Sequence, residues 1–132
     1  MEFINLTPHV VTVYAISDCI EQPDGRGYTI RKGATPRAVF QPSGMVARAT
    51  QRQEWIPPVE CDGVSIPVCN MTYGEPVGLP SDFSADRGYI VSALTANAAK
   101  ATGRCTSDLF VVQGVVRDNN GAVIGCTGFA KV

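Results

Sequence analysis

The stretch that decides the fold is YIVSALTANAAKATG, residues 89–103. Its first three residues are aromatic or β-branched and apolar, which is typical of a buried strand. Ser92 then stands at a helix N-cap position, the Ala-rich run 93–102 favours helix, and Gly103 suits the position after the helix end. We therefore expect a strand that passes directly into one short helix over about 93–102.

The helix is expected to pack closely on its neighbours. Leu94, Ala98 and Ala101 share one face at helical spacing, and Lys100 in the last turn complements the helix dipole. Because alanine side chains are small, this face allows close approach to a sheet or to another copy of the chain.

Outside this stretch the sequence indicates short strands separated by turns. The sequence Asp118-Asn119-Asn120-Gly121 is a strong hairpin signal, and Pro67 places its strand at an edge or a bulge. We expect strands at 10–16, 27–30, 37–40, 45–50, 63–68, 70–73, 89–91, 109–116 and 122–126. The prediction is an α+β fold: an antiparallel, β-rich single domain over residues 1–132 with one short helix.

Composition limits the classes of protein that remain. The 132 residues are 45% hydrophobic and 17% charged, which is too apolar for a disordered chain. No run approaches the ~20 apolar residues that a membrane-spanning helix needs, and residues 1–5 lack the pattern of a signal peptide. We expect a cytoplasmic protein without a membrane partner.

Charge is divided along the chain although the net charge is only −1. Six basic residues and no acid lie between 25 and 53, and six acids and no base lie between 54 and 86. The near-neutral total argues against a nucleic-acid polymer as partner. The two blocks either pair within the fold or form a functional basic face, and opposite blocks also suit contacts in a closed symmetric homo-oligomer.

The cysteines do not form a metal or disulfide pattern. There are five, without a CxxC pair, and His9 is the only histidine, so we expect free thiols and no metal site. Cys105 is the thiol most expected to be exposed. The neighbouring Arg104 would then lower its pKa, although an ordinary surface thiol is the simpler interpretation.

No catalytic arrangement is present in the sequence. There is no nucleophile elbow, no phosphate-binding glycine loop and no dinucleotide fingerprint. His9 either caps the start of a strand or contacts a ligand. The loop carboxylates Glu75, Asp82 and Asp86 have no fixed partner and suit a solvated surface. We predict no catalytic residues and no cofactor.

The best candidate for a ligand site is the start of the helix. A strand that enters a helix directly leaves backbone N–H groups unpaired where an anion can dock. Ser92 and Thr95 would add hydroxyl donors, and arginines from elsewhere would neutralise charge: Arg48, Arg104 or Arg117. The alternatives are that Ser92 only caps its own helix and that Arg117 only pairs with Asp118.

Several phrases occur in a fixed order that resembles a known group. They include Asn5-Leu6-Thr7-Pro8-His9, then residues 42–48 (PSGMVAR), 66–68 (IPV), 73–75 (YGE), 78–80 (GLP), 89–92 (YIVS), 116–118 (VRD) and 124–126 (IGC). This resembles a group of small, uncharacterised proteins of tailed bacteriophages and prophages that open with an Asn-Leu-Thr-Pro-His phrase. The resemblance implies a phage origin and expression in the host bacterial cytoplasm, and it implies no activity.

Two functions from different classes follow. The first is a non-catalytic phage accessory protein with an anti-defence role, which sequesters an anionic, nucleotide-like small molecule using Ser92, Thr95 and arginines, with an aromatic platform such as Tyr28, Phe40 or Tyr73. The alternative is a protein-interaction module that binds a host protein or a phage particle component. A small hydrolase is the least favoured class.

Overall fold

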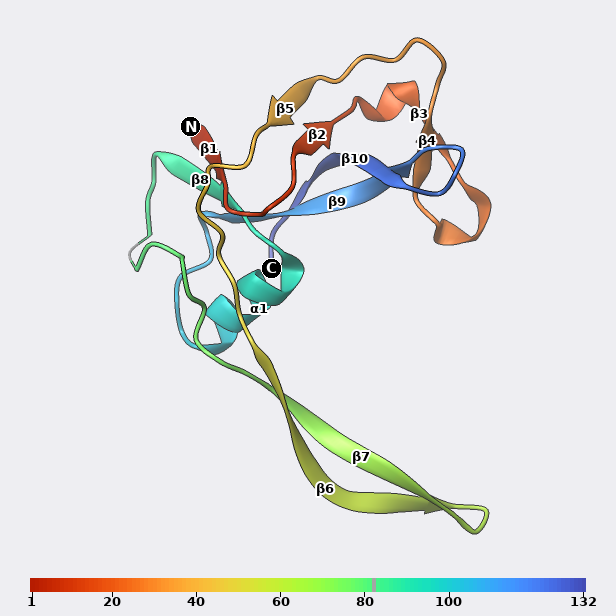
Figure 1. Cartoon of the computed structure of the whole chain (residues 1–132), viewed down its shortest axis with the longest axis vertical. Helices are drawn as coiled ribbons and strands as arrows, with labels where there is room; N and C mark the ends of the chain where they lie inside the picture. The colour runs from red at the N-terminus through yellow and green to blue at the C-terminus, as the bar shows by residue number, and fades with distance from the viewer. Residues whose placement is uncertain (82) are drawn as a thin grey trace.

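The chain forms a nearly closed, barrel-like sheet with one helix on its outside and one long hairpin projecting from it (Figure 1). The computed structural model describes residues 1–81 and 83–132, and of Asp24 it describes the backbone only. The elements are β1 (Glu2–Asn5), β2 (Val11–Val13), η1 (Ile16–Asp18), β3 (Cys19–Glu21), η2 (Pro23–Gly25), β4 (Tyr28–Ile30), β5 (Ala38–Phe40), β6 (Gln51–Cys61), β7 (Val64–Tyr73), β8 (Arg87–Ile90), α1 (Ala93–Ala101), β9 (Leu109–Arg117) and β10 (Val123–Ala130).

The main sheet curves until its two ends almost meet. Its strand order is β1-β8-β9-β10-β2-β5, and the short β3–β4 hairpin attaches through β4 to β9. Just after β5, Pro42 forms a parallel bridge with Asn5 at the end of β1, and the Ser43 N–H donates to the Asn5 carbonyl at 3.0 Å. These contacts bring the last strand of the sheet back beside the first.

The core has two parts on opposite faces of β8. Tyr89 and Val91 point towards α1, where they pack with Leu109 and the helix residues Ala96 and Ala99. On the other face, Ile90 packs with Val11, Cys126 and a set of aromatic rings. Strand alternation produces this division, because successive side chains point to opposite faces.

Four phenylalanine rings, from β1, β5, β9 and β10, form one aromatic cluster. Phe3, Phe40, Phe110 and Phe129 lie with ring centroids 5.0 to 6.1 Å apart. Gly88 makes room for them, since a Cβ there would lie 2.6 Å from a Phe3 ring atom and 2.8 Å from a Phe110 ring atom.

The helix prediction is confirmed, with a different buried face. Ser92 is the N-cap of α1, and Gly103 adopts φ +90° just beyond its end. The buried residues are Thr95, Ala96, Ala98 and Ala99, whereas Leu94 is half-buried and Ala101 is exposed. The helix is therefore rotated from the expected Leu94–Ala98–Ala101 face because it packs between the sheet and the segment around Ala47.

The β-rich class with one short helix is confirmed, but the expected antiparallel pairing holds only in part. The β9–β10, β2–β5, β3–β4 and β6–β7 pairs are antiparallel, and the β1–β8, β8–β9, β2–β10 and β4–β9 pairs are parallel. Hairpins carry local turn signals such as Asn120-Gly121, whereas parallel partners lie far apart in the chain and leave no local signal.

Several predicted strands have different limits. The expected strand 10–16 shortens to β2, and 45–50 is not a strand, although Ala47 is buried and Arg48 exposed as its alternation predicted. The expected strands 63–68 and 70–73 join as the continuous β7. The partner strand β6 was not predicted, because Pro57 and Pro58 interrupt its pattern.

Candidate binding cleft

A cleft of about 430 Å³ lies where the start of α1 meets the chain before β6. Three separate segments line it: Thr7 and Pro8, residues 46–50, and the helix start with Ser92, Leu94 and Thr95. Arg48, Ser92 and Thr95, which the sequence predicted to act together, are thus brought to one site.

Backbone contacts hold Arg48 at the cleft. The Ala47 N–H donates to the Leu6 carbonyl at 2.9 Å, and Arg48 and Val77 exchange two backbone hydrogen bonds of 2.8 and 2.7 Å. The Thr95 hydroxyl also donates to the Ala47 carbonyl at 3.4 Å. Because Ala47 is buried, the next side chain, Arg48, faces outward.

The helix start combines an occupied cap with unused donors. The Thr95 N–H donates to the Ser92 hydroxyl oxygen at 3.2 Å, and the Ser92 hydroxyl donates to Thr95 Oγ1 at 2.9 Å. Ser92 therefore caps its own helix, as the simpler alternative expected. Within the described part of the chain, the N–H groups of Ala93 and Leu94 donate to no protein acceptor.

The electrostatic character of the cleft is positive. Arg48 is the one charged residue that lines it among the described residues, and no carboxylate does. The helix contributes a further partial positive charge at its N-terminus. Both features favour an anionic group beside Ala93 and Leu94.

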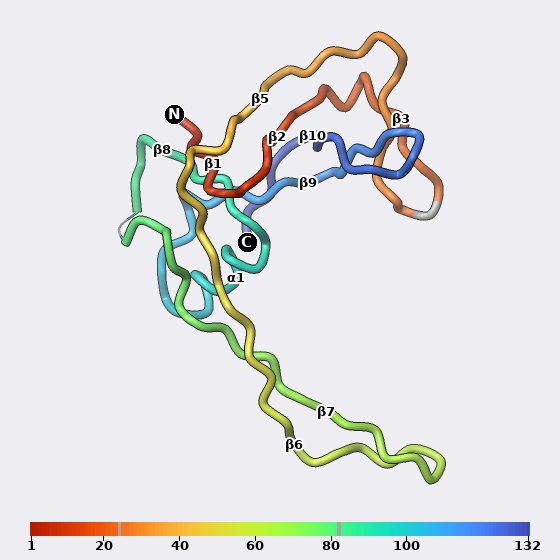
Figure 2. The backbone as a smooth tube through the Cα atoms, in the orientation of Figure 1, coloured from red at the N-terminus to blue at the C-terminus, as the bar shows by residue number. Residues whose placement is uncertain are grey.

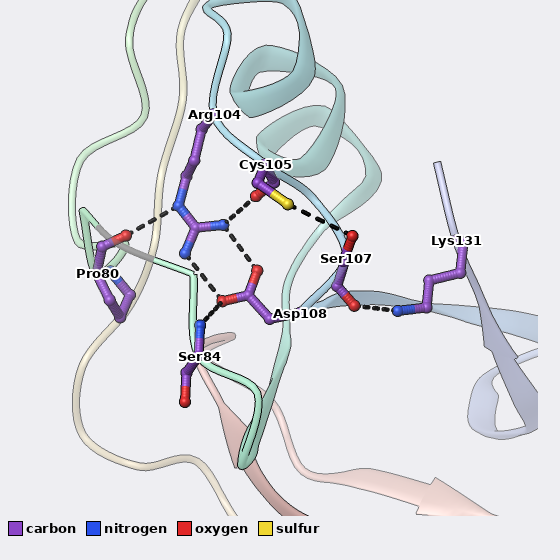
Figure 3. A network of polar contacts seen from close by, with 7 residues as sticks. All are labelled: Pro80, Ser84, Arg104, Cys105, Ser107, Asp108 and Lys131. Carbon is purple, nitrogen blue, oxygen red and sulfur yellow. Dashed lines mark hydrogen bonds and ion pairs between the residues drawn. The ribbon is translucent and has the colours of Figure 1, made fainter.

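Arg104, by contrast, has a structural position. It forms a forked ion pair with Asp108, with Nη1–Oδ1 and Nη2–Oδ2 distances of 2.8 and 3.1 Å (Figure 3). Its Nε donates to the Pro80 carbonyl at 2.9 Å, and its Nη1 donates to the Cys105 carbonyl at 2.7 Å. Its donors are thus occupied away from the cleft at Ser92, and its predicted role there is not supported.

Arg117 and His9 also lie elsewhere. Arg117 is at the end of β9, where Nη1 donates to the Gly121 carbonyl at 3.0 Å instead of pairing with Asp118. His9 is exposed, and its carbonyl accepts from Asn5 Nδ2 at 2.7 Å, so its backbone rather than its imidazole has a structural role. Neither residue lines the cleft.

Of the residues that the structure describes, no aromatic side chain lines the cleft, so the expected aromatic platform is not found there. Phe40 belongs to the aromatic cluster of the barrel, Tyr28 lies on β4, and Tyr73 ends β7. The apolar part of the cleft consists instead of aliphatic side chains, among them Pro8, Val46 and Leu94.

A second cleft, of about 560 Å³, lies at the Arg104 network, and Pro80, Arg104 and Cys105 line part of it. Glu75 and Phe83 line it as well. Cys105 is exposed, as expected, and its hydrogen bond with Ser107 lowers the pKa of its thiol. Arg104, which the sequence suggested as the cause, makes only a small contribution.

The remaining predicted side chains do not form a site. Cys19 and Cys126 are buried, and burial raises the pKa of both thiols. Glu75 and Asp86 are exposed, and Asp82 lies outside the described residues.

The sequence missed the most prominent surface of the molecule, the β6–β7 hairpin. Its strands of 11 and 10 residues pair only with each other, and every described residue of β6 is exposed. Figure 2 shows that it extends away from the rest of the chain. The alternation of Val64, Ile66 and Val68 indicated the strand β7. Its partner β6 was not predicted, because Pro57 and Pro58 interrupt the alternation there.

No protein-family model, curated protein or solved structure matches the chain. The resemblance to phage proteins therefore stays a prediction. Across residues 1–81 and 83–132, no helix has the length and apolar character to cross a membrane, and no three His, Cys, Asp or Glu side chains gather as metal ligands.

Proposed function

We propose that this chain is a non-catalytic phage accessory protein that captures an anionic, nucleotide-like small molecule in the cytoplasm of the infected bacterium. The observation that carries the proposal is the convergence of Arg48 with the open N-terminus of α1 around one cleft, which no carboxylate among the described residues lines. These residues come from segments more than 40 positions apart in the sequence.

In this proposal a phosphate group of the ligand accepts hydrogen bonds from the N–H groups of Ala93 and Leu94, and the Arg48 guanidinium pairs with the same phosphate. The less polar part of the ligand packs on Pro8 and Val46. A cleft of about 430 Å³ lies within the range of small-molecule sites. No side chain of the cleft is assigned a chemical step.

The test is titration calorimetry against cyclic di- and trinucleotides and ADP-ribose derivatives. Arg48→Ala should weaken binding by about 10- to 150-fold, which corresponds to the ~1.5–3 kcal/mol of a charged hydrogen bond. Arg117→Ala is the matched control, since Arg117 is an exposed arginine away from the cleft, and it should bind as the wild type does. Affinity should also fall as salt rises.

Two results would contradict this proposal. One is a wild-type protein that binds no compound of the panel more tightly than about 100 μM, or roughly −5.5 kcal/mol. The other is equal loss of binding in Arg48→Ala and Arg117→Ala, because the structure places only the first of these arginines at the cleft.

A second candidate function is that of a protein-interaction module for a host protein or a phage particle component. The observation that favours it is the projecting hairpin, where Trp55 and Val64 are 63% and 61% exposed. A photo-crosslinking residue at position 55 should then capture one protein in infected cells. The same residue at position 123, which is also exposed but lies on β10, should capture none.

A further inference from the structure

The β6–β7 hairpin exposes a large apolar surface that the rest of the chain does not bury. Six large apolar side chains of the hairpin are exposed: Trp55, Ile56, Val59, Val64, Ile66 and Met71. The two strands form a separate sheet that pairs with no other strand in the described part of the chain. A two-stranded hairpin alone is at best marginally stable in water, and exposed apolar clusters of this kind mark contact surfaces.

The pairing register gathers the aliphatic residues on one face of the outer half of the hairpin. Ile56 pairs with Val68, Val59 with Ile66, and Cys61 with Val64. Because directly opposed residues share a face, these three pairs form one continuous aliphatic surface near the hairpin tip.

A protein that binds this surface is expected to pack on the face of the hairpin, because the edges of the hairpin do not allow a further strand to pair with them. Pro57 and Pro58 lie where the register shifts between Ile56 and Val59, and Pro67 lies opposite them on β7. None of the three prolines has a backbone N–H to donate to an added strand. The outer edges of β6 and β7 are therefore both interrupted at the same point along the hairpin.

The charges of two exposed regions indicate which protein binds the hairpin. The tip of the hairpin carries exposed Glu60 and Asp62. Glu60 pairs with Ser65 on the face opposite the aliphatic pairs, and Asp62 lies in the turn between the strands. The loop between β4 and β5 carries exposed Arg31, Lys32 and Arg37 and no acid. This basic loop and the acidic, apolar tip thus offer opposite charges within one chain.

The two charged regions cannot meet within one molecule. Along the longest axis of the molecule the hairpin tip lies at one end and the loop between β4 and β5 at the other (Figures 1 and 2). Exposed apolar side chains flank the basic loop: Val39 on β5, which is 49% exposed, and Ile16 in η1, which is 62% exposed. The end that carries the loop therefore offers both charge and apolar surface to the hairpin of another copy.

We propose that the hairpin tip of one copy docks on the 31–37 loop of a second copy, head to tail, and so assembles the protein into a homo-oligomer. Such a contact joins two different surfaces, and it forms a ring when the rotation between copies closes. This assembly does not depend on the cleft at Ser92.

The experiment measures mass by size-exclusion chromatography with light scattering at tens of micromolar protein. The tip variant is Glu60→Lys/Asp62→Lys, and the loop variant is Arg31→Glu/Lys32→Glu. The wild type should run as a multiple of 14.0 kDa, and each variant alone should fall to the mass of one chain. A circular dichroism melt confirms that both variants are folded.

The decisive measurement uses a 1:1 mixture of the two variants. A reversed tip then meets a reversed loop, and a native tip meets a native loop, so the two variants should alternate and assemble again. An assembly with an even number of copies should regain the wild-type mass. Glu2→Lys and Lys100→Glu, at exposed positions outside both regions, are matched controls that should stay assembled.

Each other outcome overturns the proposal. A monomeric wild type shows that a second copy is not the occupant and favours a foreign protein on the hairpin. Variants that stay assembled show that the charges do not direct docking. Monomeric variants that fail to assemble when mixed exclude the head-to-tail arrangement.

Discussion

Replacing Arg104 tests whether the buried ion pair holds the structure together. The Asp108 side chain is fully buried and that of Arg104 is 12% exposed. In Arg104→Ala the Asp108 carboxylate keeps one weak contact from the Ser84 N–H at 3.3 Å and loses both guanidinium bonds. Removing one partner of a buried pair costs about 3–5 kcal/mol, because a charge is left without compensation.

The loss should appear directly in the unfolding midpoint. For a chain of 132 residues, 3–5 kcal/mol corresponds to a fall in Tm of roughly 10–20 °C. Far-UV circular dichroism during urea or thermal unfolding is the appropriate assay. The only tryptophan, Trp55, is exposed on the projecting hairpin, so its fluorescence would not report on the core.

Two further variants complete the experiment. Arg117→Ala should change stability by less than about 1 kcal/mol, since Arg117 is exposed and makes one hydrogen bond there. The apolar double variant Arg104→Met/Asp108→Leu should recover most of the loss, because it removes both charges together. A fall of less than about 1 kcal/mol in the free energy of unfolding of Arg104→Ala would refute the reasoning, since leaving a buried carboxylate unpaired should destabilise the protein by more than that.

Two other predictions concern the aromatic cluster and the thiol. Gly88→Ala should destabilise the protein by about 1–3 kcal/mol, because the added methyl group would overlap the packed rings of Phe3 and Phe110. Gly128→Ala, where a Cβ would meet nothing within 4 Å, is the control, and equal losses in urea unfolding would contradict the packing argument. Cys105 should react with iodoacetamide at lower pH than a free cysteine, because its lowered pKa gives more thiolate below the ordinary thiol pKa. Ser107→Ala should shift that pH profile of alkylation upward, and an unchanged profile would show that Ser107 is not the cause.

The local features of the sequence predicted the elements whose signals are contiguous. Ser92 and Gly103 correctly predicted the ends of α1, since a cap and a left-handed residue act within a few positions of each other. The β9–β10 hairpin was predicted from Asn120-Gly121 for the same reason. Its turn is held by Asp118 Oδ1, which accepts from two backbone N–H groups.

The candidate site was predicted only in part. Arg48 was one of three arginines offered for the helix start, and only it lies there. The sequence could not choose among them, because all three lie far from Ser92 or outside its strand, and no local pattern says which one packs beside it. The choice depends on which segment packs against α1, and the backbone contacts of residues 47 and 48 with Leu6 and Val77 decide this.

The sequence by itself determined the β-rich class, the single helix with its cap, and the division of charge into a basic and an acidic block, all of which depend on composition or neighbouring residues. Only the tertiary structure decided the parallel pairings, the closure of the sheet, the partner of Arg104 and the placement of the basic 31–37 loop and the acidic hairpin tip at opposite ends of the molecule. Those outcomes depend on contacts between segments far apart in the chain. The free energy of such contacts comes from joint burial, which no single segment encodes.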